Sequence, residues 1–485
     1  GINPLVEIEN ELFYCSYEHA FRTEYKGGFD VVIGNPPYGA KISKEQINYL
    51  VQIFGNCCLS NNLSDTYIAF YIKTLMILIK DSGVLGFIAP NTWRLIESGN
   101  DFRKFILNQM FNVYEIVQHT EKVFEDATVD VDSVFIKKFK PITVENYTEI
   151  IIGDLRKSRF NHSIQQQILK NQNSINLYLT NVHYSLINKV NISSNLVSDY
   201  YSIKNGVKPY EKGKGKPPQT GETMKLKPFT SELKIDDSFS PLIGGSSFHK
   251  YKLLWDNDYW IKYGEWLAAP RDPEIFKSKE KLIFRQTSDK IIGTLIGENF
   301  IMRNNTHIIL SNENSPISLK ALLSILNSKL VDFYYWTINP EKGEVLAEVK
   351  AFHLGMLPFP KGINTNDLDV FGQKMLDNNT LLQSINAKFN KLLQSKFEIE
   401  KLTTKLQNWH ELEFGEFLKE LQKAKVQLSL SQEAEWMQYF NEQKQKAQTL
   451  KAEIEKTDKE IDKMIYQLYG LSEEEIKIVE GENGK

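Results

Sequence analysis

The chain has 485 residues, which is enough for about two to four domains that each bury their own core. Its formal net charge is only −3, so the chain is not a uniformly basic nucleic-acid-binding protein, and any DNA contact must come from local patches. No apolar run is long enough to cross a bilayer, and the three cysteines show no zinc spacing, which favours a cytoplasmic protein without a metal site.

The first third of the sequence alternates strands with helices. Residues 29–34 include three consecutive β-branched residues, which predict a buried strand, and Pro36-Pro37 ends it because proline cannot donate to a strand ladder. The elements expected next are a helix at 65–80, a strand at 84–88, a helix at 101–109, and strands at 113–118 and 133–138 around a loop at 119–132. This alternation predicts an α/β layer structure.

The sequence texture changes twice further along the chain. Short apolar runs between Gly, Pro, Asn and Ser clusters predict a mixed α+β domain, and residues 443–469 carry the apolar spacing of an amphipathic helix that ends at Gly470 and forms a hairpin with 380–428. We therefore expect an α/β domain over 1–145, a connecting segment over 146–194, a mixed α+β domain over 195–360, and a C-terminal helical, coiled-coil-like region over 361–485.

The sharpest chemical signal is Asn35-Pro36-Pro37-Tyr38, directly after the first predicted strand. Such a tetrapeptide is expected by chance about once in a thousand chains of this length, and a plain proline turn is the structural alternative. The exocyclic amine of adenine is a poor nucleophile because its lone pair is delocalised into the ring. The side-chain oxygen of Asn35 and the rigid backbone carbonyl of Pro36 would accept both N–H bonds and free that lone pair, while Tyr38 would stack a base flipped out of the duplex.

This motif and its flanks resemble the N6-adenine DNA methyltransferases. The lead-in, helix, strand and loop of that family are matched by residues 29–34, 65–70, 83–88 and 90–93. Residues 123–130 resemble a later motif whose Phe packs against the flipped adenine. The resemblance implies that Asn35, Pro36, Pro37 and Tyr38 are catalytic and that Phe124 sandwiches the base opposite Tyr38, the alternative for Phe124 being a buried core residue.

The likeness continues into the second domain. Several segments resemble the target-recognition domain of the TaqI-like methyltransferases and of the single-chain, Eco57I-like type II restriction–modification enzymes. These segments are 260–271, 282–287, 326–330 and 357–360. The resemblance implies the C-terminal half of a Rossmann-like methyltransferase sheet followed by a target-recognition domain. It also implies a site-specific DNA adenine-N6 methyltransferase that uses S-adenosyl-L-methionine, binds double-stranded DNA and works in the bacterial cytoplasm.

The cofactor-binding motif of that family has no counterpart in this sequence. The family holds S-adenosylmethionine with a glycine-rich turn that precedes the Asn-Pro-Pro-Tyr motif, and residues 1–34 contain no such turn. Gly213-Lys214-Gly215 lies far downstream in a lysine-rich loop, which indicates flexible backbone rather than a cofactor cradle. We therefore expect a fragment that begins after the cofactor-binding motif and does not methylate DNA alone, the cofactor being bound by the full-length parent.

Basic side chains in the second domain are the candidate DNA contacts. The segment 203–227 is rich in lysine and poor in acid, which fits either contacts to phosphates or an ordinary solvated loop. Three arginines further along would read guanine edges, hold phosphates or form salt bridges. The candidate DNA-binding residues are Lys208, Lys212, Lys214, Lys216, Arg271, Arg285 and Arg303.

Two other functional interpretations remain open. The chain would instead be the DNA-recognition or specificity module of a larger type II restriction enzyme or phage-defence methyltransferase, with catalysis dependent on elements elsewhere. Methyltransferases that act on RNA or on protein glutamine carry the same tetrapeptide, but the large recognition-like domain argues against both. The sequence defines neither the DNA site nor the oligomeric state.

Overall fold

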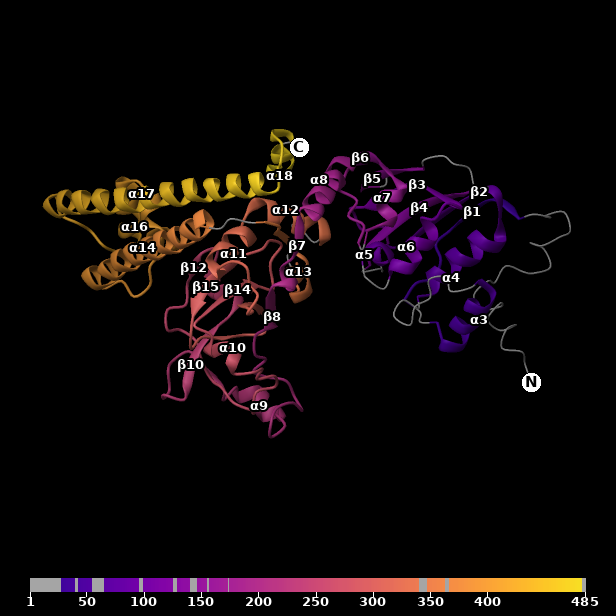
Figure 1. Cartoon of the computed structure of the whole chain (residues 1–485). Coiled ribbons are helices and arrows are strands. Elements are labelled where there is room, and N and C mark those ends of the chain that lie inside the picture. Colours follow the sequence, from indigo (N-terminus) through magenta and orange to yellow (C-terminus); the bar gives the residue numbers. More distant parts are fainter. Residues whose placement is uncertain are drawn as a thin grey trace. The chain divides into compact units, whose positions relative to one another are not determined.

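The structure, a computed structural model, divides into two compact units (Figure 1). The first unit comprises residues 1–188 and 337–340, and the second comprises 189–336 and 341–485. The residues that the structure describes are 28–39, 42–54, 65–95, 99–124, 129–139, 146–154, 157–172, 174–339, 347–362 and 366–481. Within these ranges, no helix is long and apolar enough to cross a membrane.

A mixed sheet lies at the centre of the first unit (Figure 1). Among the described residues its strand order is β1-β2-β4-β3-β5-β6, with β1 parallel to β2, β3 parallel to β5 and the other neighbours antiparallel. The strands are β1 (Phe29–Gly34), β2 (Ile79–Pro90), β3 (Phe111–His119), β4 (Val131–Lys138), β5 (Tyr147–Asp154) and β6 (Lys157–Gln165). The helices are α3 (Lys44–Phe54), α4 (Thr66–Lys73), the π-helical turn η2 (Thr74–Leu78), α5 (Thr92–Leu95), α6 (Asn100–Ile106), α7 (Gln166–Lys170) and α8 (Asn181–Ile192), which runs into the second unit.

An aromatic core fixes the helices on this sheet. Tyr71 of α4 is fully buried, and its ring meets Phe87 of β2 edge-to-face with 5.0 Å between ring centroids. The same ring meets Phe102 of α6 at 5.3 Å, and Phe102 in turn contacts the buried Trp93 of α5. Buried aromatic side chains contribute large apolar areas, so this cluster holds α4, α5 and α6 against the end of β2.

The α/β prediction is confirmed for the first unit, with differences in detail. Strands β1, β3 and β4 occupy the predicted places, but β2 begins at Ile79 rather than at residue 84. The stretch 81–83, between the predicted helix at 65–80 and the predicted strand at 84–88, lies inside β2 as an irregularity: Ser82 has a φ of +69° and the register with β1 shifts there. The turn residues therefore bend a strand instead of separating two elements.

The segment 146–194, expected to connect two domains, contributes structure to the first unit up to residue 188. It supplies β5 and β6, which pair antiparallel and extend the sheet through the parallel contact of β5 with β3. Many polar residues in Lys157–Gln165 hide the strand pattern, because β6 is an edge strand among the described residues and has no second neighbour to match.

The second unit combines small sheets with helices, as the predicted mixed α+β domain requires. Its four-stranded sheets have the orders β16-β10-β13-β9 and β15-β14-β17-β8 among the described residues. The strands are β7 (Ser194–Leu196), β8 (Tyr201–Asn205), β9 (Thr230–Ser231), β10 (Phe239–Ile243), β11 (Phe248–His249), β12 (Lys252–Leu253), β13 (Trp260–Lys262), β14 (Glu280–Arg285), β15 (Gly293–Gly297), β16 (Ile301–Met302), β17 (Thr306–Ser311) and β18 (Pro358–Pro360). The helices up to residue 356 are η4 (Val197–Asp199), α9 (Gly221–Leu226), η5 (Gly245–Ser247), α10 (Glu274–Lys277), α11 (Leu319–Leu326), α12 (Lys329–Ile338) and α13 (Ala351–Met356).

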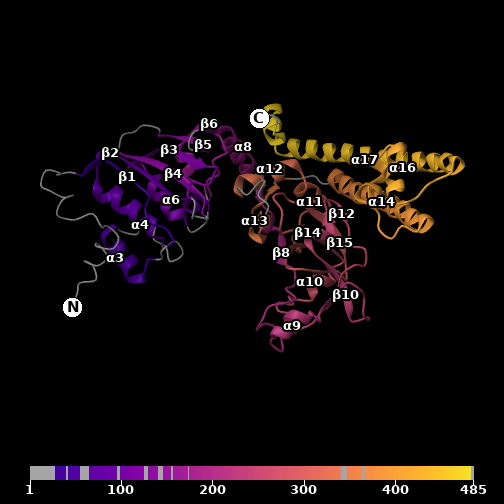
Figure 2. The same ribbon diagram turned by 180° about the vertical axis from the view of Figure 1, so that it is seen from behind.

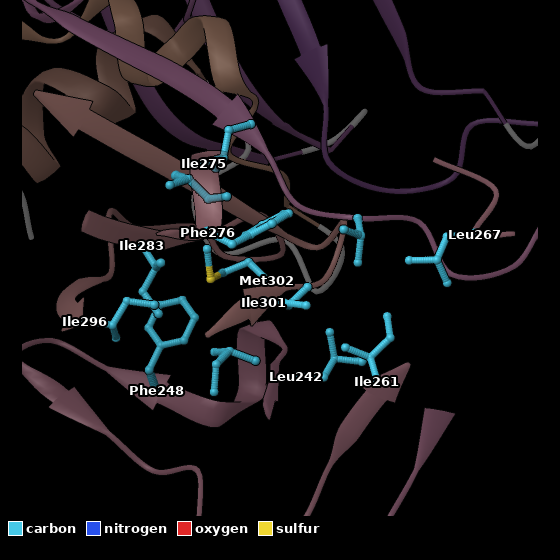
Figure 3. Packing of buried hydrophobic residues seen from close by; sticks show 13 residues of the cluster. Leu242, Phe248, Ile261, Leu267, Ile275, Phe276, Ile283, Ile296, Ile301 and Met302 are labelled. Atoms are coloured by element: carbon cyan, nitrogen blue, oxygen red, sulfur yellow. The ribbon is translucent and has the colours of Figure 1, made fainter. Parts of the chain in front are cut away.

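One apolar core joins the two four-stranded sheets. Leu242 of β10, Ile283 of β14 and Met302 of β16 are fully buried in it, together with Phe276 of α10. Figure 3 shows these side chains gathered in one cluster. Because the core draws on both sheets, the loops between their strands are held on a common support.

The C-terminal region is helical, as predicted. It contains α14 (Asn366–Phe397), α15 (Thr404–Gln407), η6 (Trp409–Glu411), α16 (Phe414–Lys423), α17 (Leu430–Leu468) and α18 (Glu473–Glu480). Helices α14 and α17 run side by side in both views, so a helical hairpin is present (Figures 1 and 2). Its arms are 366–397 and 430–468 rather than the predicted 380–428 and 443–469. Phe389 stacks on Trp409 with 3.7 Å between ring centroids in the core between them, and Gly470, with a φ of +63°, follows the end of α17.

Candidate functional site

The Asn35–Tyr38 motif begins at the carboxyl end of β1. The strand stops there because Pro36 and Pro37 have no N–H to continue the ladder with β2. Asn35 and Pro37 are exposed, Pro36 is buried and Tyr38 is half-buried. Asn35 is therefore accessible from solvent.

Helix α4 fixes the backbone of the motif. The hydroxyl of Thr66 donates to the carbonyl of Pro37 at 2.6 Å, and the carboxylate of Asp65 accepts from the N–H of Gly39 at 3.2 Å. Gly39 has a φ of +86°, which favours glycine at this turn. Among the described residues none donates to the carbonyl of Pro36, whereas the hydroxyl of Thr66 occupies that of Pro37.

Loops from three other strands lie at the same edge of the sheet. Because β1 is parallel to β2, the loop after Pro90 lies beside the motif, and Tyr67 reaches Thr92 there with 3.3 Å between their oxygens. The N–H of Asn91 donates to the carbonyl of Asp130 at 3.0 Å, which ties this loop to the start of β4. The carboxyl ends of open α/β sheets are where such folds bind ligands.

Phe124 follows β3 at this edge and lines a hollow of about 220 Å³ together with His119 and Val131. The strand order puts β1 and β3 three spacings apart, roughly 14 Å. His119 is buried, and its Nε2 lies 2.9 Å from the hydroxyl of Ser133. Burial lowers the pKa of His119, so its imidazole is neutral at pH 7. Residues 125–128 of the matched motif lie outside the described residues, and the pairing of Phe124 with Tyr38 stays a prediction.

A buried ion pair that the sequence reasoning missed supports these loops. Arg94 of α5 donates to both carboxylate oxygens of Asp132 at 2.6 and 3.3 Å, and both side chains are almost fully buried. Arg94 also donates to the carbonyl of Ile175 at 3.2 Å. The pair links the loop after β2 to the first residues of β4. An Asp inside the apolar run Val131–Ile136 was the available sequence signal, since a buried charge needs a partner.

Three of the predicted DNA contacts surround one backbone segment of the second unit. Lys208 pairs with Ala269 in an antiparallel bridge, and Val207 pairs with Arg303 in a parallel one. Nε of Arg271 donates to the carbonyl of Gly206 at 3.1 Å. A Cβ at Gly206 would lie 2.2 Å from the carbonyl oxygen of Arg303, so only glycine permits this approach. The structure thus brings Lys208, Arg271 and Arg303 together, with both arginines exposed.

The remaining predicted DNA contacts divide into two groups. Lys212, Lys214 and Lys216 are exposed on the loop before α9, where Lys216 lies 4.0 Å from Glu265. Arg285 is different, because its guanidinium donates to the carbonyl of Phe248 at 3.0 Å through Nε and is half-buried. The structure therefore uses Arg285 to hold β11, and its assignment to DNA stays an untested prediction.

Lys281 is a buried cation that sequence reasoning did not single out. Its ammonium donates to the carbonyls of Phe276, Ser278 and Gly297 at 3.0, 3.1 and 2.6 Å. Desolvation lowers the pKa of Lys281 to about 8, against 10.5 in its ordinary state. Between about pH 8 and 10.5 the unfolded chain therefore binds more protons at this site than the folded chain.

We expect this lysine to make the stability of the second unit rise with pH above 8. The gain in the free energy of unfolding should reach up to about 3 kcal/mol across the window. The measurement is chemical denaturation at pH 8, 9 and 10 for the wild type and for Lys281→Met, which should lack this rise. Lys279→Met, at an exposed position nearby, should keep it. An equal rise in both variants would contradict the assignment to Lys281.

Family models match successive parts of the chain. The model described as "Eco57I restriction-modification methylase" matches residues 3–124, which include the Asn35–Tyr38 motif and Phe124. The model described as "TaqI-like C-terminal specificity domain" matches residues 240–359. A third, "Domain of unknown function (DUF8810)", matches residues 363–465, which cover the α14–α17 hairpin.

Relatives in sequence agree with these matches. RM.MjaORFECS2P of Methanocaldococcus jannaschii is 24% identical over 329 residues, covering 64% of this chain and 25% of the relative. The type II restriction enzyme and methyltransferase RM.Eco57I of Escherichia coli is 30% identical over 134 residues, covering 27% of this chain and 13% of the relative. Modification methylase CviBIII of Paramecium bursaria Chlorella virus NC1A is 21% identical over 314 residues, covering 62% of this chain and 76% of the relative. The chain spans a quarter or less of the first two relatives.

These matches confirm the family resemblance drawn from the motifs. The site at the end of β1 falls within the methylase model, and the sheets around Gly206 and Arg303 fall largely within the specificity model. The chain therefore combines an Eco57I-like restriction–modification methylase domain with a TaqI-like C-terminal specificity domain.

Proposed function

We propose that this protein methylates the N6 amine of adenine in a specific duplex DNA sequence, as part of a restriction–modification enzyme. The observation that carries the proposal is the geometry of residues 35–38. Asn35 is exposed at the carboxyl end of β1, and no described residue occupies the carbonyl of Pro36. Two fixed acceptors at this place suit the two N–H bonds of an adenine amine.

The chemistry of this site is positioning and polarisation rather than proton removal. Asn35 is too weak a base to take a proton, but its oxygen and that of Pro36 together favour a pyramidal amine whose lone pair is available. The Thr66 and Asp65 contacts hold the backbone of the turn, so the carbonyl of Pro36 needs little rearrangement when the base arrives. Tyr38, half-buried beside them, is proposed to stack on the flipped base, with Phe124 on its other face.

The methyl donor implied by the family is S-adenosyl-L-methionine, and the described residues do not fit a cradle for it. Gly213-Lys214-Gly215 lies in a loop of the second unit and opens no long helix. β1 is an edge strand among the described residues, with Val31 and Ile33 exposed by 60% and 78%. We therefore assign only the adenine side of the reaction to the described residues and propose that others hold the donor.

The specificity domain is proposed to bind the duplex through its exposed cations. Lys208, Arg271 and Arg303 converge on the 206–208 segment, and the lysines before α9 lie on the loop that follows it. Each phosphate contact should add about 0.9 to the slope of log affinity against log salt concentration.

Removing two lysines of this loop should weaken DNA binding and reduce its salt dependence. For Lys212→Gln/Lys214→Gln we expect the slope to fall by about 1.8, because two phosphate contacts are lost. The measurement is fluorescence anisotropy titration of duplex DNA between 50 and about 300 mM salt. Lys277→Gln is the matched control, since Lys277 is exposed but paired with Glu274 at 2.6 Å. An unchanged slope in the double variant would remove this loop from the interface.

The proposed reaction is tested by the identity of the modified base. DNA from cells that express the gene encoding this chain should contain N6-methyladenine, measured by nucleoside mass spectrometry, and an otherwise identical strain lacking the gene should not. Methylated cytosine in place of methylated adenine would contradict the proposed substrate. Duplex binding without any base modification would favour the alternative, a specificity module that depends on another protein for catalysis.

A further inference from the structure

A hollow of about 450 Å³ lies beside the lysine-rich loop of the second unit. We call it the proline pocket. Its walls include Pro217, Pro218, Thr223, Phe229, Lys262 and Trp266. Ligand sites usually measure roughly 300–1,000 Å³, so this pocket has the size of a small ligand site, whereas the 220 Å³ hollow beside Phe124 is smaller.

A buried glutamine holds the pocket open. Gln219 is only 4% exposed, and its side-chain N–H groups donate to the carbonyls of Pro209 at 2.8 Å and Trp266 at 2.9 Å. Its side-chain oxygen accepts from the N–H of Glu211 at 2.9 Å. The side-chain amide of Gln219 therefore uses its nitrogen and its oxygen to bind backbone groups of the protein. These hydrogen bonds hold the pocket wall in place before any ligand binds.

The aromatic walls are fixed as well. Phe229 stacks on Tyr210 with 5.5 Å between ring centroids and 10° between ring planes, and the Tyr210 hydroxyl accepts from the N–H of Phe229 at 2.7 Å. Trp266 donates from Nε1 to the carbonyl of Lys262 at 3.0 Å. The ammonium of Lys262 lies 5.9 Å from the Trp266 ring centroid. A partly exposed indole with a cation beside it suits a flat, electron-rich ring.

The charges around the pocket select a polyanion. Lys212, Lys214, Lys225 and Lys227 are exposed, and none forms a salt bridge with a described residue. The acids of the same stretch are Glu211, which pairs with Lys208 at 2.7 Å, and Glu222. Phe229 and Trp266 offer apolar ring surface beside the ammonium of Lys262, and exposed lysines lie on the stretch 212–227 that supplies one wall of the pocket. This combination matches a nucleotide, whose base is flat and whose neighbouring phosphates are negative.

We propose that the proline pocket takes one unpaired DNA base, stacked on Trp266, while the surrounding lysines hold the adjoining phosphates. The proposal rests on the proposed DNA function and deepens it. The specificity domain would then capture a base of the opened duplex at a place distinct from the adenine site beside Asn35. A base in this slot makes no hydrogen bond with the occupied Gln219, so the pocket recognises unpairing rather than sequence.

The test compares two single-stranded oligonucleotides of equal charge, one carrying bases and one abasic throughout its centre, by fluorescence anisotropy with the full chain. All proteins carry Tyr38→Ala, which removes the predicted stacking residue of the adenine site. The wild-type pocket should bind the base-bearing strand about 10-fold more tightly than the abasic strand. Trp266→Phe should keep most of this ratio, and Trp266→Leu should bring it close to 1.

A pocket-filling variant covers the case in which Trp266→Leu fails to fold. Thr223 is partly exposed on α9, so Thr223→Trp fills the slot from its rim and should also reduce the ratio to about 1. A ratio near 1 in the unmodified pocket overturns the proposal, and so does a ratio that survives both Trp266→Leu and Thr223→Trp. If cells expressing the unmodified gene contain no N6-methyladenine but the base-bearing strand still binds about 10-fold more tightly than the abasic strand, the proposed reaction is contradicted. The assignment of the pocket is then still supported.

Discussion

Replacing Asn35 with alanine is expected to lower methyl transfer to adenine by about two to three orders of magnitude. Loss of one preorganised hydrogen-bonding group at a reacting centre has an effect of that size. Asn35 is exposed, so the free energy of unfolding should change by less than about 0.5 kcal/mol. The measurement is the single-turnover rate of methyl incorporation into duplex DNA by the full-length parent enzyme, because this chain alone is not expected to hold the methyl donor. Thermal unfolding is followed in parallel.

Two control variants separate the chemistry from structural damage. Asn35→Asp keeps an oxygen acceptor at the same place and should retain more activity than Asn35→Ala. Asn48→Ala, at an exposed position in α3, should match the wild type in both rate and stability. Full activity in Asn35→Ala would contradict the role of this amide.

Replacing Asp132 with alanine is expected to destabilise the first unit by about 3–5 kcal/mol. The change leaves the guanidinium of Arg94 buried without its carboxylate, and an uncompensated buried charge has a cost of that size. For a unit of this size the melting temperature should fall by roughly 6–20 °C. Scanning calorimetry or circular dichroism of the purified chain measures the transition.

Removing both charges should recover much of the loss. Arg94→Met/Asp132→Leu replaces the ion pair with apolar side chains, and such replacements are often neutral or stabilising. Asp130→Ala is the matched single change, since Asp130 is exposed two residues away and uses only its backbone carbonyl to hold Asn91. A drop for Asp130→Ala as large as that for Asp132→Ala would show that the loop, not the buried pair, determines the stability.

Local sequence patterns predict the parts of the site that depend on neighbouring residues. The strand before Asn35, its stop at Pro36 and the helix near Thr66 follow from β-branched residues, proline geometry and apolar spacing. The long helix α17 follows from an amphipathic pattern without Gly or Pro. These features need no knowledge of distant contacts, and the structure has them close to the predicted places.

Contacts between distant segments escape the same reasoning. Arg94 and Asp132 lie 38 positions apart and meet only because α5 and β4 pack together. The contact of the Arg285 guanidinium with the carbonyl of Phe248 in β11 also joins residues 37 positions apart, and the predicted DNA role of Arg285 stays untested. Strand β5 pairs with β3, and β6, whose apolar pattern is weak, is held only through its pairing with β5 among the described residues. Each of these features depends on contacts between residues that are distant in the sequence, which local sequence propensities do not predict.

Asn35 and Pro36 are proposed to accept hydrogen bonds from the amine of a flipped-out adenine. Single-molecule sequencing of DNA from cells that express the encoding gene tests this role most directly, with the wild type and Asn35→Ala compared in the same strain. We predict N6-methyladenine at one recurrent sequence in the wild type and its loss in Asn35→Ala, with equal amounts of protein. The same methylated sequence at the same level in Asn35→Ala would contradict the claim.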